Sequence, residues 1–297
     1  MAKSSKKGFK KRGTLTTLLA VIAAVIYMLF FSPMGEERAE KIQLDGTMQV
    51  HMIDVGQGDS LLVVSPEGDI MLIDAGTNDS EPQLRSYLDS QGITEITYAV
   101  FTHPHEDHIG GADMVLNNYD VKNVIIPDAT HTSTTFERML EAIDKNNVNT
   151  IIPSPGDKFD LGSASFLILG PVGSGYEELN DYSIVLRLDY GGTSFMMTGD
   201  AETLSEREML SYFPASEFKC DVLKMGHHGS STSSCDEFLD AVDPDIALIS
   251  CAEGNDYGHP HREIVAAIKE RSIVSYNTAE VGSVVLKADG STITVVE

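Results

Sequence analysis

Hydrophobic and polar positions alternate along the chain in a pattern of short strands and amphipathic helices from about residue 48 onward. Apolar runs bounded by turn residues predict strands, and apolar residues three and four apart predict helices. The predicted strands cover residues 49–54, 60–64, 69–74, 96–102, 123–127, 165–170, 183–190, 193–199, 221–225, 246–250 and 273–276, followed by a hairpin over 283–296. The predicted helices cover residues 81–90, 112–118, 135–146, 202–212, 236–242 and 261–270.

Two strand-rich halves, each followed by helices, predict the fold class. This pattern suits two mixed β-sheets packed together with helices on the outside. The run 96–102 is continuous and apolar, as expected of a strand that is buried on both faces. No repeat or linker interrupts the pattern. We therefore expect an α/β protein with a single αββα sandwich domain over residues 47–297.

An apolar segment near the N-terminus predicts contact with a membrane. Residues 14–31 contain no charge and are about long enough to cross a bilayer as a helix. Basic residues precede this segment and acidic residues follow it, which favours a cytoplasmic N-terminus. We expect a basic cytoplasmic leader (1–12), a transmembrane anchor or signal segment (13–31) and a polar spacer (32–46). The domain is then extracellular on a single-pass membrane protein, or secreted if the segment is cleaved.

Composition adds a strong acidic bias to this picture. The overall contents of 42% hydrophobic and 22% charged residues are ordinary for a globular protein. Six of the 21 basic residues lie in the first twelve positions, so that 15 basic residues remain against 45 acidic ones. The three cysteines, Cys220, Cys235 and Cys251, form no CxxC pair. Their odd number implies no disulfide framework, although one bridge among them stays open.

The strongest chemical signal is THPHEDHIGG, residues 102–111, which follows the apolar run 96–102. It places four metal-binding side chains within six residues. In a loop between strand and helix, His103 and His105 can face one point while Asp107 and His108 face another about 3.5–4 Å away, the spacing of a two-metal site. The glycine pair behind them lets the backbone turn sharply into the next helix.

The HxHxDH pattern resembles the metal-binding signature of the metallo-β-lactamase superfamily, whose members are metal-dependent hydrolases of the αββα fold. Other motifs of the superfamily follow in the same order. Asp74 in LIDAG resembles the aspartate that supports the metal-binding loop. Asp200 in MTGD resembles the bridging aspartate, and His227 resembles the late histidine ligand. The resemblance implies two divalent metal ions, zinc or manganese.

Four narrower motifs indicate one branch of the superfamily. They are DVGQGDS (54–60), NDYS (180–183), KMGHHGS (224–230) and YGHP (257–260). These motifs are similar to the extracellular domain of the competence DNA-uptake channel protein, and also to surface phosphorylcholine esterases. The likeness runs from Gln49 to the C-terminus and lacks the multi-spanning channel. We therefore expect a stand-alone, membrane-anchored version of that domain.

The resemblance also implies two sets of metal ligands. One ion would be held by Asp107, His108, Asp200 and His227, and the other by His103, His105 and Asp200. A third histidine usually completes the second set, and Asn180 stands in its place here. His131 is the alternative, since its loop could reach the site. The resemblance therefore predicts a weaker second ion.

The remaining polar residues of these motifs receive roles in hydrolysis. A metal-bound hydroxide is a nucleophile at neutral pH, and Asp107 takes part as a ligand of the reacting metal. His228 and His259 are the candidate proton donors to the leaving group. Alternatively, His228 packs against or anchors His227, and His259 holds its own turn in place.

Other residues of the motifs are expected to bind substrate or to support the site. Ser230 would contact a phosphate of the substrate, and Asn180 and Ser183 would orient the substrate or support the loop. Asp54 and Asp59 would support the first hairpin turn beside the site. Elsewhere, His51 is expected on a strand face and His261 at the start of a helix.

The motifs favour a phosphodiester substrate, either nucleic acid or a phosphorylated envelope polymer. The acidic composition disagrees with the first, because affinity for nucleic acid normally comes from lysine and arginine. Two other functions stay open. One is hydrolysis of β-lactams or other small esters, and the other is a non-catalytic surface-binding domain that keeps the fold. No protein partner is predicted.

Overall fold

The computed structural model describes residues 42–296. The predicted leader (1–12), the predicted anchor (13–31) and most of the spacer (32–46) lie outside the described residues. Within 42–296, no helix combines the length and the apolar character needed to span a bilayer. The anchor and the domain boundaries therefore stay predictions.

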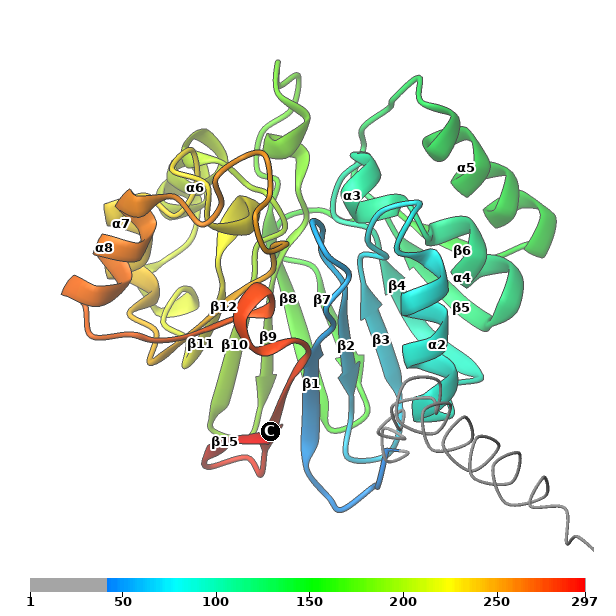
Figure 1. Ribbon diagram of the computed structural model, residues 1–297, viewed down its shortest axis with the longest axis horizontal. Coiled ribbons are helices and arrows are strands. Elements are labelled where there is room, and N and C mark those ends of the chain that lie inside the picture. Colours follow the sequence, from blue (N-terminus) through cyan, green and yellow to red (C-terminus); the bar gives the residue numbers. More distant parts are fainter. Residues whose placement is uncertain (1–41, 297) are drawn as a thin grey trace, which may run out of the picture. The chain divides into compact units, whose positions relative to one another are not determined.

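Two mixed β-sheets form the centre of the domain (Figure 1). The strands of the first sheet, in spatial order, are β15 (Ile293–Val296), β14 (Val284–Ala288), β1 (Met48–Met52), β2 (Leu61–Val64), β3 (Ile70–Ile73), β4 (Glu95–Val100), β5 (Asp120–Ile125) and β6 (Asn149–Ile151). Those of the second are β13 (Val274–Asn277), β12 (Ile246–Ile249), β11 (Val222–Lys224), β10 (Thr193–Met197), β9 (Val185–Tyr190), β8 (Ala164–Gly170) and β7 (Lys158–Leu161).

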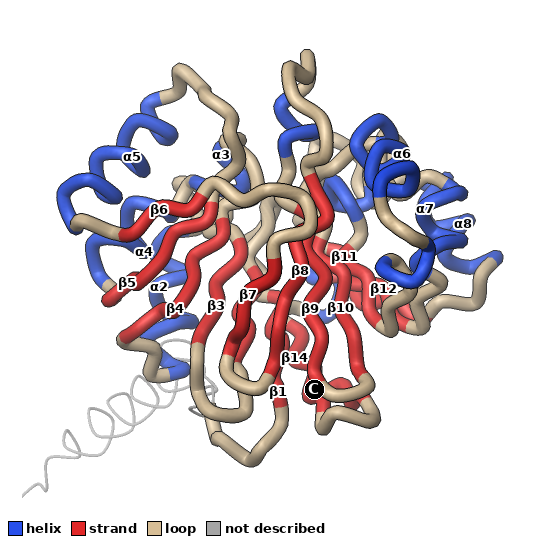
Figure 2. Tube along the Cα trace, turned by 180° about the vertical axis from the view of Figure 1, so that it is seen from behind, coloured by secondary structure: helices blue, strands red, loops and turns tan. Residues whose placement is uncertain are grey.

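Helices cover the outer face of each sheet. The α-helices are α2 (Glu81–Gln91), α3 (Glu106–Ile109), α4 (Ala112–Asn118), α5 (Thr134–Asn146), α6 (Thr203–Tyr212), α7 (Asp236–Val242), α8 (Arg262–Glu270) and α9 (Thr278–Val281). Figures 1 and 2 show α2, α4 and α5 against the first sheet and α6, α7 and α8 against the second. The expected αββα sandwich is confirmed.

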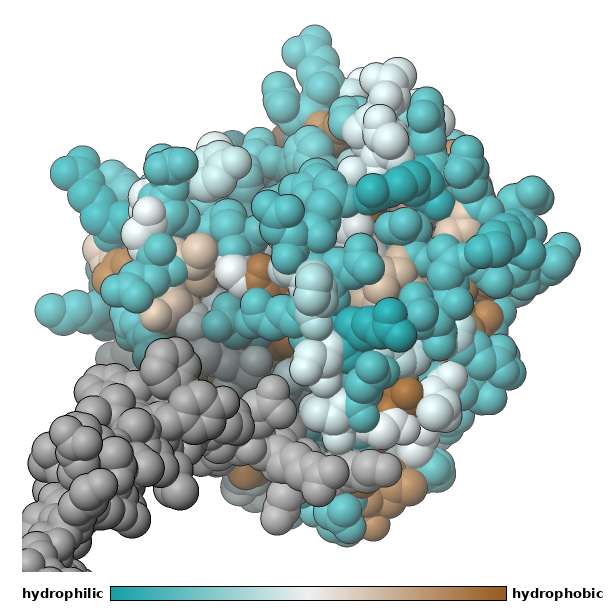
Figure 3. Space-filling model, turned by 45° about the vertical axis from the view of Figure 1, so that its right-hand side comes forward, coloured by the Kyte–Doolittle hydropathy of each residue, from teal (hydrophilic) through white to brown (hydrophobic). Residues whose placement is uncertain are grey.

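Each central strand contributes side chains both to the core between the sheets and to a core under the outer helices, because successive side chains point to opposite faces. In β3, Leu72 packs among the helices on the outside, whereas Met71 and Ile73 pack between the two sheets. In β10, Met196 packs toward the outer helices and Met197 between the sheets. Continuous apolar runs are therefore required, which is why these strands are readable in the sequence. The face shown in Figure 3 is mostly hydrophilic, with scattered hydrophobic residues.

Helix ends agree with the local sequence. Ser133 begins α5 by accepting a hydrogen bond from the backbone N–H of Phe136 at 3.2 Å. Gly92 ends α2 in the left-handed conformation, which glycine adopts without strain. His261 precedes α8, as predicted, and Asp289-Gly290 lies in the turn between β14 and β15.

Gly110 corrects one interpretation of the metal-binding loop. Its φ is −53°, so the residue needs no special backbone freedom. A Cβ at this position would instead overlap the carbonyl carbon of Thr77 and the backbone nitrogen of Asn78. The glycine is therefore required because the loop after β3 packs directly against it. This contact presses the metal-binding loop against the end of the first sheet.

Replacing Gly110 with Ala should destabilise the fold, because backbone must move to admit the methyl group. We expect the free energy of unfolding to fall by about 1–3 kcal/mol or more, measured by urea denaturation. Gly192→Ala is the matched control, since its Cβ would meet nothing closer than 3.4 Å. Equal denaturation midpoints for the two variants would contradict the close-approach explanation.

Candidate metal centre

The polar residues of the site follow the carboxyl ends of two pairs of parallel strands. In the first sheet, β3 and β4 are parallel neighbours that lead into Asp74 and His103. In the second, β10 and β11 are parallel neighbours that lead into Asp200 and His227. Carboxyl ends of parallel strands meet at one edge of a sheet, where open α/β sheets place their ligands.

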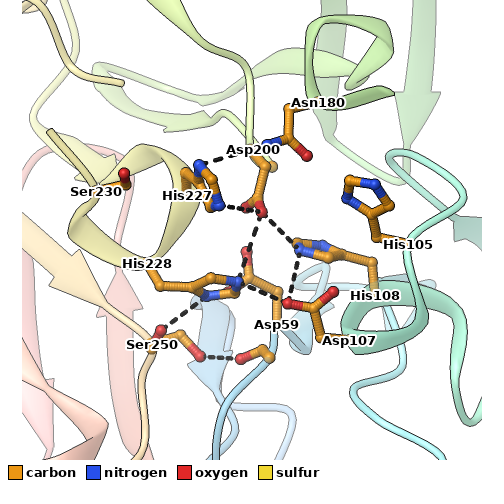
Figure 4. A network of polar contacts seen from close by, with 12 residues as sticks. Asp59, His105, Asp107, His108, Asn180, Asp200, His227, His228, Ser230 and Ser250 are labelled. Carbon is orange, nitrogen blue, oxygen red and sulfur yellow. Dashed lines mark hydrogen bonds and ion pairs between the residues drawn. The ribbon is translucent and has the colours of Figure 1, made fainter. Parts of the chain in front are cut away.

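The carboxylate of Asp200 is the meeting point of these groups. Its Oδ2 atom lies 3.2 Å from Nε2 of His108, 3.6 Å from Nε2 of His228, 3.8 Å from Nε2 of His227 and 4.0 Å from Nε2 of His103. Figure 4 shows this carboxylate between His108, His227 and His228. Asp200 is buried, and its Oδ1 has no hydrogen-bond partner among residues 42–296.

Four residues form the metal cluster, a name used here for Asp107, His108, Asp200 and His228. Each offers one ligand atom, and these atoms all lie within 4.8 Å of one another. This group contains His228, where the resemblance predicts His227. The reason is the backbone, because both histidines have positive φ, 49° and 55°, and this turn directs the second ring inward.

The chemistry of the metal cluster fits a divalent cation. Burial disfavours charge on His108 and His228, but the nearby carboxylates outweigh it. Asp200 is the main carboxylate that raises the pKa of both, to about 10 for His228. Burial opposes charge on Asp200 too, yet the two imidazoles hold its pKa well below the usual value. Bound protons thus balance the carboxylates, and a metal ion would displace them. Mixed imidazole and carboxylate ligands suit zinc or manganese.

A buried ion pair holds His228 in position. Nδ1 of His228 lies 2.9 Å from the carbonyl oxygen of Ser250 and 3.2 Å from Oδ1 of Asp59. Oδ2 of Asp59 lies 2.5 Å from Nζ of Lys224, and both side chains are fully buried. Burial opposes the charge of Asp59, but Lys224 and then His228 lower its pKa to about 2. The ring of His228 is therefore fixed, with Nε2 facing the metal cluster.

Asp74 supports His108 in the same manner. Its Oδ2 lies 2.7 Å from Nδ1 of His108, and its Oδ1 accepts a hydrogen bond of 2.7 Å from the backbone N–H of Thr102. Burial raises the pKa of Asp74, against the opposing effect of His108. Such contacts fix the ring and its tautomer, so that Nε2 is presented to a metal.

Sequence comparison agrees with this geometry. Residues 53–253 match the family model described as Metallo-beta-lactamase superfamily.

The chain belongs to the metallo-β-lactamase superfamily.

Two curated relatives narrow the branch. The chain is 31% identical to "ComE operon protein 3" of Bacillus subtilis over 89% of its own length and 35% of that protein. It is 30% identical to "Recombination protein 2" of Haemophilus influenzae over 80% of its own length and 28% of that protein. The chain thus spans about a third of the length of these relatives. A third relative is "Competence protein ComA" of Neisseria gonorrhoeae, 27% identical over 74% of this chain and 29% of that protein. The predicted resemblance to competence proteins is confirmed.

Solved structures agree in fold alone. The metallo-β-lactamase fold protein YhfI from Bacillus subtilis superposes with a TM-score of 0.53 at 13% identity, covering 84% of this chain and all of that one. The diiron β-hydroxylase CmlA from Streptomyces venezuelae superposes with a TM-score of 0.53 at 13% identity, covering 80% of this chain and 52% of that one.

The second predicted ligand set is less complete than the metal cluster. Nε2 of His103 lies 3.0 Å from Nδ1 of His105, and the two rings meet edge to face at an angle of 79°. Burial, and then the nearby His108, hold the pKa of His103 well below its usual value. Asn180 donates to Oε1 of Glu202 at 3.0 Å, and its buried Oδ1 has no partner within 42–296.

His131 also reaches this side of the centre. Its ring centre lies 6.4 Å from that of His105. Asn180 and His131 therefore both stay candidates to complete the second set.

The hydroxyls of Ser183 and Ser230 lie inside the protein. Ser183 is completely buried, lies 3.3 Å from Nδ1 of His103 and accepts a hydrogen bond of 3.1 Å from the backbone N–H of Asp200. Ser230 is 3% exposed, and its hydroxyl lies 3.1 Å from that of Thr232. These internal contacts favour the loop-supporting alternative for Ser183, and the substrate contact of Ser230 stays a prediction.

The structure also describes the surroundings of the two predicted proton donors, His228 and His259. Both ring nitrogens of His228 are engaged, one by the metal cluster and the other by Asp59 and Ser250. This geometry favours His228 as a candidate ligand, and its role as a proton donor stays a prediction. The ring of His259 stacks on that of His228 at 6.0 Å, and burial with the charge of His228 lowers its pKa to about 4. His259 is neutral at neutral pH.

Other predicted positions keep structural roles. Oδ1 of Asp54 accepts a hydrogen bond of 3.0 Å from the backbone N–H of Gly56, which fixes the turn of DVGQGDS. His51 is buried on β1, with Nδ1 2.8 Å from the hydroxyl of Tyr87. Cys220, Cys235 and Cys251 are free thiols.

Three residues that support the site were not assigned a role from the sequence. Lys224 stands inside KMGHHGS, and its burial was the missing information. Glu202 follows Asp200 by two positions and lies 3.3 Å from Nδ1 of His227. Ser250 acts through its carbonyl oxygen, for which side-chain identity carries no signal.

Metal content should distinguish the two adjacent histidines. His228→Ala removes a ligand of the metal cluster. Loss of a residue that only supports a ligand typically lowers metal affinity by about 10–100-fold, and we expect His228→Ala to lower it further. His227→Ala should retain the cluster ion, because its Nδ1 is held by Glu202 and Thr232 outside the cluster.

The readout is metal stoichiometry by mass spectrometry together with competition against a chelator. His261→Ala, at the start of α8, is the control for removing an imidazole. If His227→Ala loses the ion and His228→Ala keeps it, the ligand assignment is reversed.

Proposed function

We propose that this protein is a metal-dependent phosphodiesterase. The metal cluster carries the proposal, because two carboxylates and two imidazoles converge there at the end of both sheets. Two relatives are named for competence and recombination, and recombination acts on nucleic acid, a phosphodiester polymer. Divalent ions activate water and neutralise charge on phosphoryl oxygens. That chemistry matches a phosphodiester more closely than it matches an uncharged ester.

The residues of the site have separate roles in the proposed reaction, namely metal binding, proton transfer and positioning. Asp107, His108, Asp200 and His228 would hold the ion. His227 is the partly exposed imidazole beside Asp200, and Glu202 holds its Nδ1 at 3.3 Å. Its Nε2 therefore faces the centre and is placed to hold a proton next to the leaving oxygen. Asn180 keeps Glu202 in place through its 3.0 Å hydrogen bond.

Hydrolysis of defined substrates tests this proposal. The purified chain should hydrolyse bis-p-nitrophenyl phosphate and single-stranded DNA, lose this activity on chelation, and regain it with Mn²⁺ or Zn²⁺. Asp200→Asn should remove metal and activity together, because this carboxylate lies within 4.0 Å of four imidazoles of the centre. Asp243→Asn, an exposed aspartate at the end of α7, is the matched control.

Two outcomes would contradict the phosphodiesterase proposal. Metal-loaded protein that opens nitrocefin but cleaves no phosphodiester would assign it to β-lactam hydrolysis. Metal-loaded protein that is inert on all these substrates would make it a non-catalytic binding domain.

We also propose that residues 13–31 anchor the domain on the outside of the cell membrane. The support is the uncharged segment between a basic leader and an acidic domain. Alkaline phosphatase fused after residue 297 should be active, because this reporter folds only outside the cytoplasm, and the fusion should sediment with membranes. Activity of a cytoplasmic reporter fused at the same point would contradict this topology.

A further inference from the structure

A stack of aromatic rings leads from the metal cluster to the surface. The ring of His259 stacks on that of His228 with centres 6.0 Å apart and an angle of 30°. The ring of Tyr257 stacks in turn on His259 with centres 5.5 Å apart and an angle of 19°. Tyr257 is 67% exposed, the largest exposed fraction among the large hydrophobic side chains of the described region. A flat ring therefore stands open to solvent, two ring contacts from a candidate metal ligand.

The loop that carries this ring is held in place. Asn255 donates through Nδ2 to the carbonyl oxygens of Ala252 at 2.9 Å and His259 at 2.7 Å. Its Oδ1 accepts a hydrogen bond of 2.9 Å from the backbone N–H of His259. Gln57, from the DVGQGDS turn, accepts one of 3.2 Å from the backbone N–H of Ala252. A ring on such a closed loop binds a partner with little loss of conformational entropy.

The charge around the ring argues against binding through phosphate alone. Residues 252–260 contain Glu253 and Asp256 and no lysine or arginine. Affinity for a phosphodiester chain must then come from the metal centre and from contacts that need no positive charge. Stacking of a base on an aromatic ring is such a contact.

We propose that Tyr257 is a stacking subsite for a nucleobase of single-stranded nucleic acid whose phosphodiester lies at the metal centre. The subsite rests on the proposed phosphodiesterase function and names its substrate class. A phosphorylated polymer without aromatic groups would leave the ring unused. Because every base has a flat face, the subsite accepts any sequence but requires unpaired bases.

The chain contains no tryptophan, so a single reporter can be placed in the stack. Tyr257→Trp should show fluorescence quenching on titration with oligothymidylate in the metal-loaded, chelator-free protein. An abasic oligonucleotide of the same length should leave the fluorescence unchanged. Tyr212→Trp, on the last turn of α6 and 60% exposed, is the control and should respond to neither. Equal quenching of the Tyr257→Trp variant by the two oligonucleotides would overturn the subsite.

Kinetics provide the second arm of the test. Tyr257→Ala should raise KM for oligothymidylate by about 10-fold with kcat nearly unchanged, in line with base stacking on aromatic side chains. KM for the abasic oligonucleotide should not change, and Tyr257→Phe should restore binding. Unchanged KM in Tyr257→Ala, with turnover intact, would overturn the subsite and leave the phosphodiesterase standing. Base-dependent quenching without any turnover would support the subsite and reject the phosphodiesterase.

Discussion

The placement of one buried carboxylate, Asp200, governs the organisation of the site. A carboxylate without water is costly unless positive charge or hydrogen bonds surround it. Four imidazole nitrogens lie between 3.2 and 4.0 Å from its Oδ2, and two of them come from the opposite sheet. The end of the sandwich is therefore organised by the need to satisfy this charge.

The histidines around Asp200 are in turn held by a second layer of charged residues. Asp74 holds His108 from the first sheet. The pair of Asp59 and Lys224 holds His228 and crosses from the DVGQGDS turn to β11. A buried ion pair of this kind adds little net stability, but loss of one partner leaves an uncompensated charge. The motifs that define this branch are thus the parts of one continuous set of charges and hydrogen bonds.

The sequence predicts this fold well where burial imposes a pattern. Helices α4 and α7 have the predicted bounds, because their apolar faces are regular. It misses the short edge strands β6 (Asn149–Ile151) and β7 (Lys158–Leu161), which carry exposed residues, and the single-turn helices α3 and α9. It names His227 as the ligand, whereas the structure groups His228 with the other candidate ligands. Two adjacent histidines have the same side-chain chemistry, so only the backbone decides which ring points into the site. Here both residues are in the left-handed conformation, which the sequence does not predict.

The arrangement of the metal cluster also bears on how the domain holds together. Asp107 and His108 lie in α3, which follows β4 of the first sheet, whereas Asp200 and His228 follow strands of the second. An ion bound by all four residues would link the two sheets. Because this site exists only in the folded protein, the free energy of metal binding would add to the free energy of folding. The melting temperature of the domain would then rise with the free concentration of metal. Scarcity of the ion would reduce the amount of folded protein as well as its chemistry.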